Sequence, residues 1–230
     1  QQGKSQRRSQ RRGMDELSQH ASITLSRTDE YGNPLAINTM AQIALITRLR
    51  QAATYPAGIE IKDEFGQVVM SVSEDVQESA KIDKAIQIVL EAVEDGRRVA
   101  VFSQFKGALI SLDDQLALMG VRTVRLDGDT DKETRAAIKT NFDKSQGEES
   151  KWDVVLANYK TGGVGLNFTA CTVLVTLDEE WNAGKKDQAL ARVQRIGEDG
   201  QALIHETMVR GCSVQGTLRV GGARDKLEEG

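Results

Sequence analysis

Residues 152–182 read WDVVLANYKTGGVGLNFTACTVLVTLDEEWN, and this stretch decides the fold class. It contains two apolar segments, 152–157 and 171–177, on either side of a glycine-rich loop. Each segment is rich in valine and leucine and does not alternate between apolar and polar residues. Such runs are typical of strands that are buried on both faces, as in parallel sheets covered by helices. The stretch therefore predicts two strands of a parallel sheet.

The residues before this stretch continue the alternation of strands and helices. The pattern predicts a helix that ends at Gly96, a strand over 98–103, a helix that ends at Gly120 and a strand over 122–126. Thr130, followed three residues later by Glu133, forms a capping box that opens a further helix. We expect an α/β three-layer domain over residues 79–210, with a mainly parallel sheet.

A helical segment is predicted ahead of this domain, over residues 14–53. Its apolar residues from Ile37 through Ile43 to Leu49 recur at spacings of three and four, which predicts one buried face. Asn38 or Thr39 is the expected N-cap.

A linker is expected between this helix and the α/β domain. Tyr55-Pro56 and Gly58 end the helix, and the linker reaches residue 78 with a hairpin around residues 64–66. The role of residues 211–230 is left open.

The composition excludes disordered and fibrous proteins, because 39% of the 230 residues are hydrophobic, 28% are charged and two are proline. No uncharged apolar run approaches the ~18 residues of a membrane span, and no apolar segment follows the basic N-terminus as in a signal peptide. We expect no membrane partner and an intracellular location. That location would be the cytoplasm or nucleoid in a bacterium or phage, and the nucleus in a eukaryote.

The charge is distributed unevenly along the chain. The formal net charge is -4, but residues 1–12 hold five Lys and Arg side chains and no acid. The totals of 30 basic and 34 acidic residues leave 25 basic and 34 acidic side chains in residues 13–230. The basic arm, residues 1–13, could contact a phosphate backbone. The alternative is a solvated, disordered terminus.

Cysteine and histidine are too scattered for a structural zinc site. Cys171 and Cys212 lie far apart, and neither His20 nor His205 stands near them at ligand spacing. Cys171 is predicted to be a small core residue, and a disulfide with Cys212 is the lesser alternative.

The loop over residues 158–168 could hold an anion. Gly162, Gly163 and Gly165 remove side chains that would keep backbone amides away from a phosphate. A dinucleotide-binding fingerprint would need a third glycine at Phe168, so that class is excluded. The alternative is a glycine-rich turn without a ligand.

A helix predicted over residues 187–197 places Gln188, Arg192 and Arg195 at spacings of four and three. One face of that helix would present an amide and two guanidinium groups, which suit phosphate because the planar fork of arginine grips phosphoryl oxygens. The alternative is a solvated amphipathic helix.

Five short segments then occur in an order that resembles one family. VFSQF (101–105), RLDGDT (125–130), TGGVGLNF (161–168), DEEWN (178–182) and DQALARVQRIG (187–197) resemble successive motifs of the second RecA-like lobe of Swi/Snf-type DNA translocases, in helicase superfamily two. The resemblance covers about residues 79–200, and RLRQAA (48–53) resembles the segment that leads into this lobe. It implies a RecA-like fold, with residues 14–78 as an interlobe segment.

The resemblance also implies site residues. Arg192 and Arg195 would reach ATP phosphates held by the other lobe, and the remaining ATP-binding positions would be Gln188, Gly163 and Gly165. The DNA-binding positions would be Ser103, Gln104, Phe105, Lys160, Thr161, Asn167, Trp181 and Asn182.

The sequence contains neither a Walker A loop nor the acidic Walker B run. Both belong to the first lobe in this family, so the resemblance implies ATP and Mg²⁺ as cofactors of the complete protein and an isolated chain that is inactive. The implied partners are that first RecA-like lobe and double-stranded DNA. Two alternatives stay open: a non-catalytic nucleic-acid-binding module that retains the fold, and an RNA helicase lobe.

Overall fold

The computed structural model describes residues 31, 39–62, 67–72, 79–143, 151–161, 167–178, 184 and 203–206. The chain forms two compact units, residues 1–83 and 84–230, each with a hydrophobic core of its own. The domain boundary that the sequence predicts between residues 78 and 79 stays a prediction. Among the helices in the described ranges, none is both long and apolar enough to cross a membrane.

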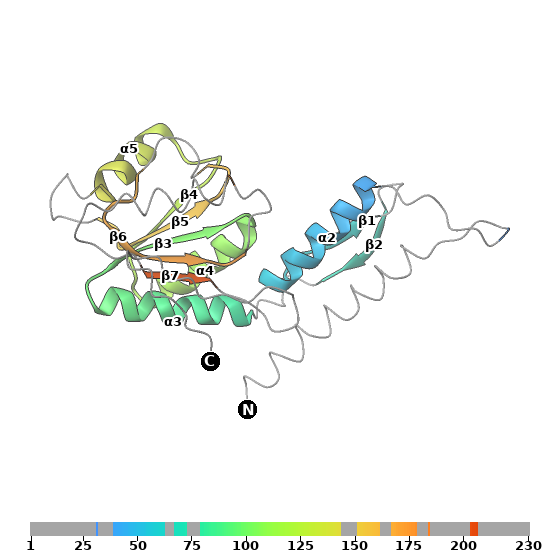
Figure 1. The fold of residues 1–230 in the computed structure, drawn as a ribbon, viewed down its shortest axis with the longest axis horizontal. Helices are drawn as coiled ribbons and strands as arrows, with labels where there is room; N and C mark the ends of the chain where they lie inside the picture. Colours follow the sequence, from blue (N-terminus) through green and yellow to red (C-terminus); the bar gives the residue numbers. More distant parts are fainter. Residues whose placement is uncertain are drawn as a thin grey trace, which may run out of the picture. The chain divides into compact units, whose positions relative to one another are not determined.

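The larger unit is built on a sheet whose five described strands run parallel in the order β4-β5-β3-β6-β7 (Figure 1). These strands are β3 (Arg98–Ser103), β4 (Thr123–Leu126), β5 (Val154–Asn158), β6 (Cys171–Thr176) and β7 (Leu203–Glu206). Val101 in β3 pairs with Leu156 of β5 on one side and with Val175 of β6 on the other. The first four strands confirm the predicted ones, whereas β7 is a strand that the sequence pattern did not predict.

Helices cover both faces of the sheet, which confirms the three-layer architecture. α4 (Lys106–Leu118) connects β3 to β4 and packs against β3, β4 and β5. α5 (Lys132–Asn141) connects β4 to β5, a step in the opposite direction across the sheet. Because crossovers between parallel strands are right-handed, steps in opposite directions place their helices on opposite faces. Burial agrees, since Ala100 and Phe102 share a core with Ile138 of α5 while Val99 and Val101 are buried on the other face.

Phe102 lies at the centre of the core beneath α5. Its ring centroid is 5.6 Å from that of Tyr159 and 6.1 Å from that of Phe168, and Phe168 lies 6.2 Å from Phe142. All four rings are buried. Aromatic pairs at these separations add to the free energy gained by burial. The end of β5 is thereby fixed against the middle of the sheet.

Cys171 belongs to the same core and confirms its predicted place there. It is fully buried and free, and burial raises the pKa of its thiol above the ordinary value. Cys212 lies outside the described residues.

Two helices end at the glycines predicted from the sequence. α3 (Ala80–Glu94) is followed by Gly96 with a φ of 70°, and α4 is followed by Gly120 with a φ of 78°. Residues other than glycine rarely adopt this left-handed backbone conformation, which commonly ends helices. Both predicted helix ends are confirmed.

The start of α5 differs from the prediction. Asp131 is the N-cap in place of Thr130, because its carboxylate accepts hydrogen bonds from the N–H and the hydroxyl of Thr134 over 2.8 and 2.7 Å. The Thr130 hydroxyl is engaged elsewhere: it accepts the Asp127 N–H over 2.9 Å and donates to the Arg125 carbonyl over 3.3 Å. The predicted capping box is therefore wrong.

The smaller unit contains α2 (Thr39–Thr54) and an antiparallel pair of strands, β1 (Glu60–Lys62) and β2 (Val68–Ser71). These confirm the predicted hairpin, and the predicted helical segment over residues 39–53; residues 14–30, 32–38 and 63–66 lie outside the described ranges. Ala52 and Ile59 form the core of this unit, with Leu49 and Val72 packed against them. The Val72 N–H donates to the Ile59 carbonyl over 2.8 Å, which joins the two strand ends.

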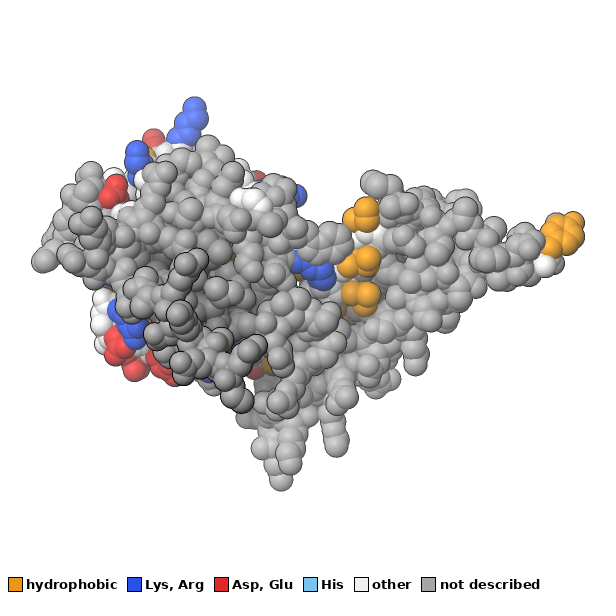
Figure 2. Space-filling view, viewed as in Figure 1, with side chains coloured by type: hydrophobic (Ala, Val, Ile, Leu, Met, Phe, Trp, Pro, Cys, Tyr) orange, Lys and Arg blue, Asp and Glu red, His pale blue; other side chains and the backbone are white. Residues whose placement is uncertain are grey.

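The predicted apolar face of α2 is not buried along its whole length. Ile43 is 44% exposed and Ile46 is 42% exposed, and apolar side chains of this helix reach the surface in Figure 2. Among the side chains of this helix that the structure describes, strong burial is confined to its end, as at Ala52 and Ala53. The prediction of a buried face is thus wrong for Ile43. Ile37 and Asn38 lie outside the described residues.

Candidate functional site

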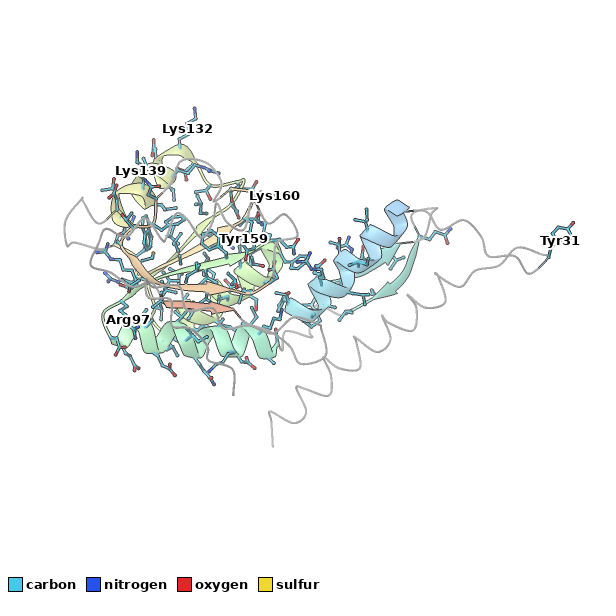
Figure 3. All side chains as sticks on the ribbon, in the orientation of Figure 1. Tyr31, Arg97, Lys132, Lys139, Tyr159 and Lys160 are labelled. Carbon is cyan, nitrogen blue, oxygen red and sulfur yellow. The ribbon has the colours of Figure 1, made fainter. Side chains whose placement is uncertain are left out.

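The carboxyl ends of parallel strands meet at one edge of the sheet, and five of the eight predicted DNA-binding residues gather there. Ser103 ends β3, and Gln104 and Phe105 follow it before α4 begins. Lys160 and Thr161 follow β5, the strand beside β3. Figure 3 shows Tyr159 and Lys160 at this edge and Arg97 at the opposite one. Two segments more than fifty residues apart in sequence thus form one surface, which we call the carboxyl edge.

Asp178, just after β6, connects the ends of three strands. Its carboxylate accepts a hydrogen bond from the Ser103 hydroxyl, and both of its oxygens lie 3.2 Å from the Gln104 backbone nitrogen. Its own carbonyl accepts the Tyr159 hydroxyl over 2.8 Å. With only 5% of its surface exposed, Asp178 is a buried acid held by loops that follow β3 and β5.

Asn158, the last residue of β5, joins the same loops from the other side. Its amide nitrogen donates to the Gln104 carbonyl over 3.0 Å, and its amide oxygen accepts the Lys160 N–H over 2.9 Å. The Thr161 hydroxyl donates to the Leu126 carbonyl at the end of β4 over 3.0 Å. Side-chain hydrogen bonds therefore link the ends of β3, β4, β5 and β6.

The loop after β4 contributes charged groups to the carboxyl edge. The Lys106 ammonium forms an ion pair with Asp129 and lies 3.5 Å from a carboxylate oxygen of Asp127. The Asp129 N–H donates to Asp127 over 2.9 Å. Arg135 of α5 donates to the carbonyls of Asp127 and Thr130 over 2.6 and 2.9 Å, which fixes the loop to the helix.

These contacts set the charge states of the loop. Burial acts to raise the pKa of Asp127, but the Asp129 N–H and the Lys106 ammonium outweigh it, so the pKa of this carboxyl lies below its ordinary value. The hydrogen bond from Lys106 to Asp129 raises the pKa of that ammonium. The ion pairs thus favour the charged forms of Asp127 and of Lys106, the first residue of α4.

Lys160 supplies an exposed positive charge beside this network. Its backbone is fixed by Asn158, while its side chain points away from the sheet (Figure 3). An exposed ammonium on a turn whose backbone is held by Asn158 can contact phosphate oxygens without changing the loops beneath it. Within the described part of the chain, no three acidic, histidine or cysteine side chains gather to hold a metal ion.

The structure describes six of the thirteen residues proposed from the sequence. It brings Ser103, Gln104, Phe105, Lys160 and Thr161 to the carboxyl edge, whereas Asn167 lies four residues ahead of Cys171, where β6 begins at the opposite edge. The others lie outside the described residues: Gly163, Gly165, Trp181, Asn182, Gln188, Arg192 and Arg195.

Asp178 and Asn158 are residues of this network that the sequence reasoning missed. Both stand where a buried strand ends, and a polar residue in that position was the available signal. Their specific partners depend on β3 lying between β5 and β6, an order that a single sequence does not reveal.

Comparison with known proteins identifies the family to which the domain belongs. Residues 80–197 match the family described as Helicase conserved C-terminal domain. An uncharacterized ATP-dependent helicase of Mycoplasma pneumoniae is 28% identical over 152 residues, which cover 66% of this chain and 14% of that protein. The chromatin-remodeling ATPase INO80 of Saccharomyces cerevisiae is 24% identical over 204 residues, which cover 82% of this chain and 13% of that protein. The chain thus spans about one seventh of the length of these relatives.

Solved structures confirm the fold. The C-terminal part of the Fun30 ATPase domain matches with a TM-score of 0.65 at 18% identity, covering 86% of this chain and 80% of that one. The SWI2/SNF2 ATPase core of Sulfolobus solfataricus in complex with double-stranded DNA matches with a TM-score of 0.58 at 21% identity, covering 88% of this chain and 38% of that one. The predicted α/β RecA-like architecture and the resemblance to Swi/Snf-type lobes are therefore confirmed.

Proposed function

The chain belongs to the helicase conserved C-terminal domain family, and from this premise we propose that it is the C-terminal motor lobe of a Snf2-type ATPase that moves along double-stranded DNA. The observation that supports this proposal is the carboxyl edge, where the Asn158 side chain bonds to both the Gln104 carbonyl and the Lys160 N–H. A lobe that steps along DNA must keep its backbone contacts in fixed register. The network of hydrogen bonds provides that register.

The catalytic part of the proposal concerns residues outside the described ranges. Arg192 and Arg195 would act on ATP bound by a first lobe, with Gln188, Gly163 and Gly165 completing the nucleotide contacts. ATP and Mg²⁺ would be held mainly by that first lobe, because this sequence has no Walker A loop. Trp181 and Asn182 would extend the DNA contacts, whereas Asn167, which lies toward the opposite edge of the sheet, is left out of this surface. The intracellular location expected from the sequence stays a prediction.

DNA binding by the carboxyl edge can be tested with two matched lysines. Lys160 lies at this edge, whereas Lys139 is an exposed lysine in the last turn of α5, at the other end of the helix from Lys132 (Figure 3). We expect Lys160→Ala to weaken binding of this chain to a double-stranded oligonucleotide about two- to fivefold, and to reduce the slope of log K against log salt by about one. Fluorescence anisotropy between 50 and 200 mM salt, about the range over which such contacts respond, measures both.

Lys139→Ala should leave the affinity and the salt slope unchanged. Equal losses for the two variants would mean that DNA is attracted by the charge of the whole lobe, and no loss for Lys160→Ala would refute the assignment of this edge. ATP turnover by the chain alone should stay at background. Robust DNA-stimulated turnover would refute the proposal that ATP is held mainly by a separate first lobe.

A further inference from the structure

The peptide groups of Gln104 are held from two sides. Its N–H donates to the Asp178 carboxylate and its carbonyl accepts the Asn158 amide, so both neighbouring peptide planes are fixed by side chains from the ends of the two adjacent strands, β6 and β5. A turn at the edge of a sheet is ordinarily satisfied by water. Here the two hydrogen bonds fix the backbone of Gln104 and thereby the direction in which its half-buried side chain starts.

Asp178 also fixes the residues around Gln104. The Ser103 hydroxyl donates to Asp178 and accepts the Phe105 N–H over 3.0 Å, so the carboxylate orders three consecutive residues. The Asp178 carbonyl binds the Tyr159 hydroxyl, one residue before Lys160. A single residue thus connects the segment of Gln104 with the segment of Lys160.

We propose that Asp178 is a positioning residue that sets the register between Gln104 and Lys160, so that both can contact the same DNA backbone. This inference rests on the proposed function. Asp178 touches no DNA in this scheme, because it is buried, and it acts only through the loops that it holds. Removing it should misplace the contact residues while the sheet and its aromatic core stay folded, because those strands pack through Phe102 and its neighbours.

The test compares two substitutions at this position in the 230-residue chain. Asp178→Ala removes both acceptor oxygens, whereas Asp178→Asn keeps one for the Gln104 N–H. We expect Asp178→Ala to weaken binding to a double-stranded oligonucleotide about threefold to tenfold, and Asp178→Asn to recover part of that loss. The amide of Gln104 should exchange with deuterated water faster in Asp178→Ala than in the unaltered chain, because its acceptor is lost.

A double-mutant cycle separates positioning from general destabilisation. Gln104→Ala should weaken DNA binding in the unaltered chain. It should have much less effect when Asp178→Ala is already present, because a misplaced Gln104 side chain no longer contributes to the affinity. Asp153→Ala is the matched control: Asp153 accepts hydrogen bonds from Arg122 over 2.9 and 2.6 Å just before β5, away from the carboxyl edge. It should leave the DNA affinity unchanged.

The outcomes are distinguishable. If the unaltered chain binds DNA and folded Asp178→Ala binds equally well, or if the two substitutions are additive, the positioning role is refuted and the proposed function stands. If Asp178→Ala does not fold, the same comparison is made with Asp178→Asn, for which unaltered affinity refutes the role. If the unaltered chain binds no DNA, the proposed function and this inference both fail.

Discussion

The side-chain amide of Asn158 donates a hydrogen bond to the Gln104 carbonyl over 3.0 Å, so the last residue of β5 is fastened to the turn that follows β3. This contact crosses between neighbouring parallel strands at their carboxyl ends. It lies on the opposite side of Gln104 from the contact with Asp178, and the two hold one turn between them.

We predict that Asn158→Ala weakens both stability and DNA binding. It leaves the Gln104 carbonyl and the Lys160 N–H without this partner at a half-buried site, which should lower the free energy of unfolding by about 0.5–1.5 kcal/mol. The affinity for a double-stranded oligonucleotide should fall at least about twofold, because one of the two connections between the contact segments is lost and Asp178 alone still joins them. Urea unfolding and fluorescence anisotropy measure the two effects.

Asn141→Ala is the control for this prediction. Asn141 ends α5, away from the carboxyl edge, where it donates to the Trp152 carbonyl over 2.9 Å and accepts the N–H groups of Lys151 and Trp152 over 2.6 and 3.1 Å. Its loss should cost more stability, about 1–3 kcal/mol, because the site is only 8% exposed. DNA affinity should not change. A loss of affinity that merely follows stability in both variants would contradict the prediction.

Arg135 is predicted to hold the loop after β4 in a way that lysine cannot reproduce. Its guanidinium donates from two different nitrogens to the carbonyls of Asp127 and Thr130, and an ammonium cannot span both acceptors with that planar geometry. Arg135→Lys should lower the free energy of unfolding by about 1.5 kcal/mol, and the melting temperature by about 2–8 °C.

Arg122→Lys is the matched substitution, because Arg122 pairs with the carboxylate of Asp153 at an exposed site where lysine keeps the charge. Its melting temperature should stay close to that of the unaltered chain in a calorimetric scan. If both substitutions lower the melting temperature equally, the two carbonyl contacts of Arg135 have no special role.

The low pKa of Asp127 predicts a specific dependence of stability on pH. A carboxyl whose pKa is lower in the folded state stabilises the fold above its unfolded pKa of about 3.9, and that contribution is lost as the pH falls through the folded value. The unaltered chain should therefore be more stable than Asp127→Asn at pH 7, and the difference should shrink below about pH 4. Urea midpoints at several pH values between these limits measure it. A difference that persists unchanged to pH 3 would assign the effect to shape and not to charge.

The strand predictions were confirmed where burial on both faces determines the sequence pattern. β3 and β6 are continuous apolar runs because both of their faces are covered, and this pattern is visible in one sequence. β7 is short, and its strand geometry depends on pairing with β6, so its own residues give a weak signal.

The errors arise where the folded structure, and not the residue type, selects the hydrogen-bond partner. Thr130 has the residue type of an N-cap, but its hydroxyl bonds to the Arg125 carbonyl of β4, and Asp131 takes the cap. Asp178 was missed as a site residue for the same reason, since Ser103 becomes its neighbour only when β6 pairs with β3. The local sequence pattern predicts helices and strands. Which loops lie next to one another depends on the order of the strands in the sheet.

The final prediction concerns Arg192 and Arg195, which lie outside the described residues and are proposed to act on ATP from across the cleft between two lobes. Their spacing of three residues on a predicted helix lets both guanidinium groups face one ligand. Arginine fingers in related phosphoryl transfer raise the rate by about 10³- to 10⁵-fold, and lysine keeps the charge without the planar fork. We therefore expect Arg192→Lys or Arg195→Lys, in a protein that joins this lobe to a Walker-containing first lobe, to lower DNA-stimulated ATP turnover at least about 10²-fold.

Arg97→Lys provides the comparison for these two arginines. Arg97 is half-buried at the opposite edge of the sheet, where it pairs with Asp95, so its replacement should leave turnover unchanged (Figure 3). Melting temperature and DNA affinity should change little in all three variants, because each substitution keeps the positive charge. Steady-state ATPase assays with and without double-stranded DNA make the comparison. Near-normal turnover in both Arg192→Lys and Arg195→Lys would refute the catalytic role of these two arginines and favour the alternative of a solvated amphipathic helix.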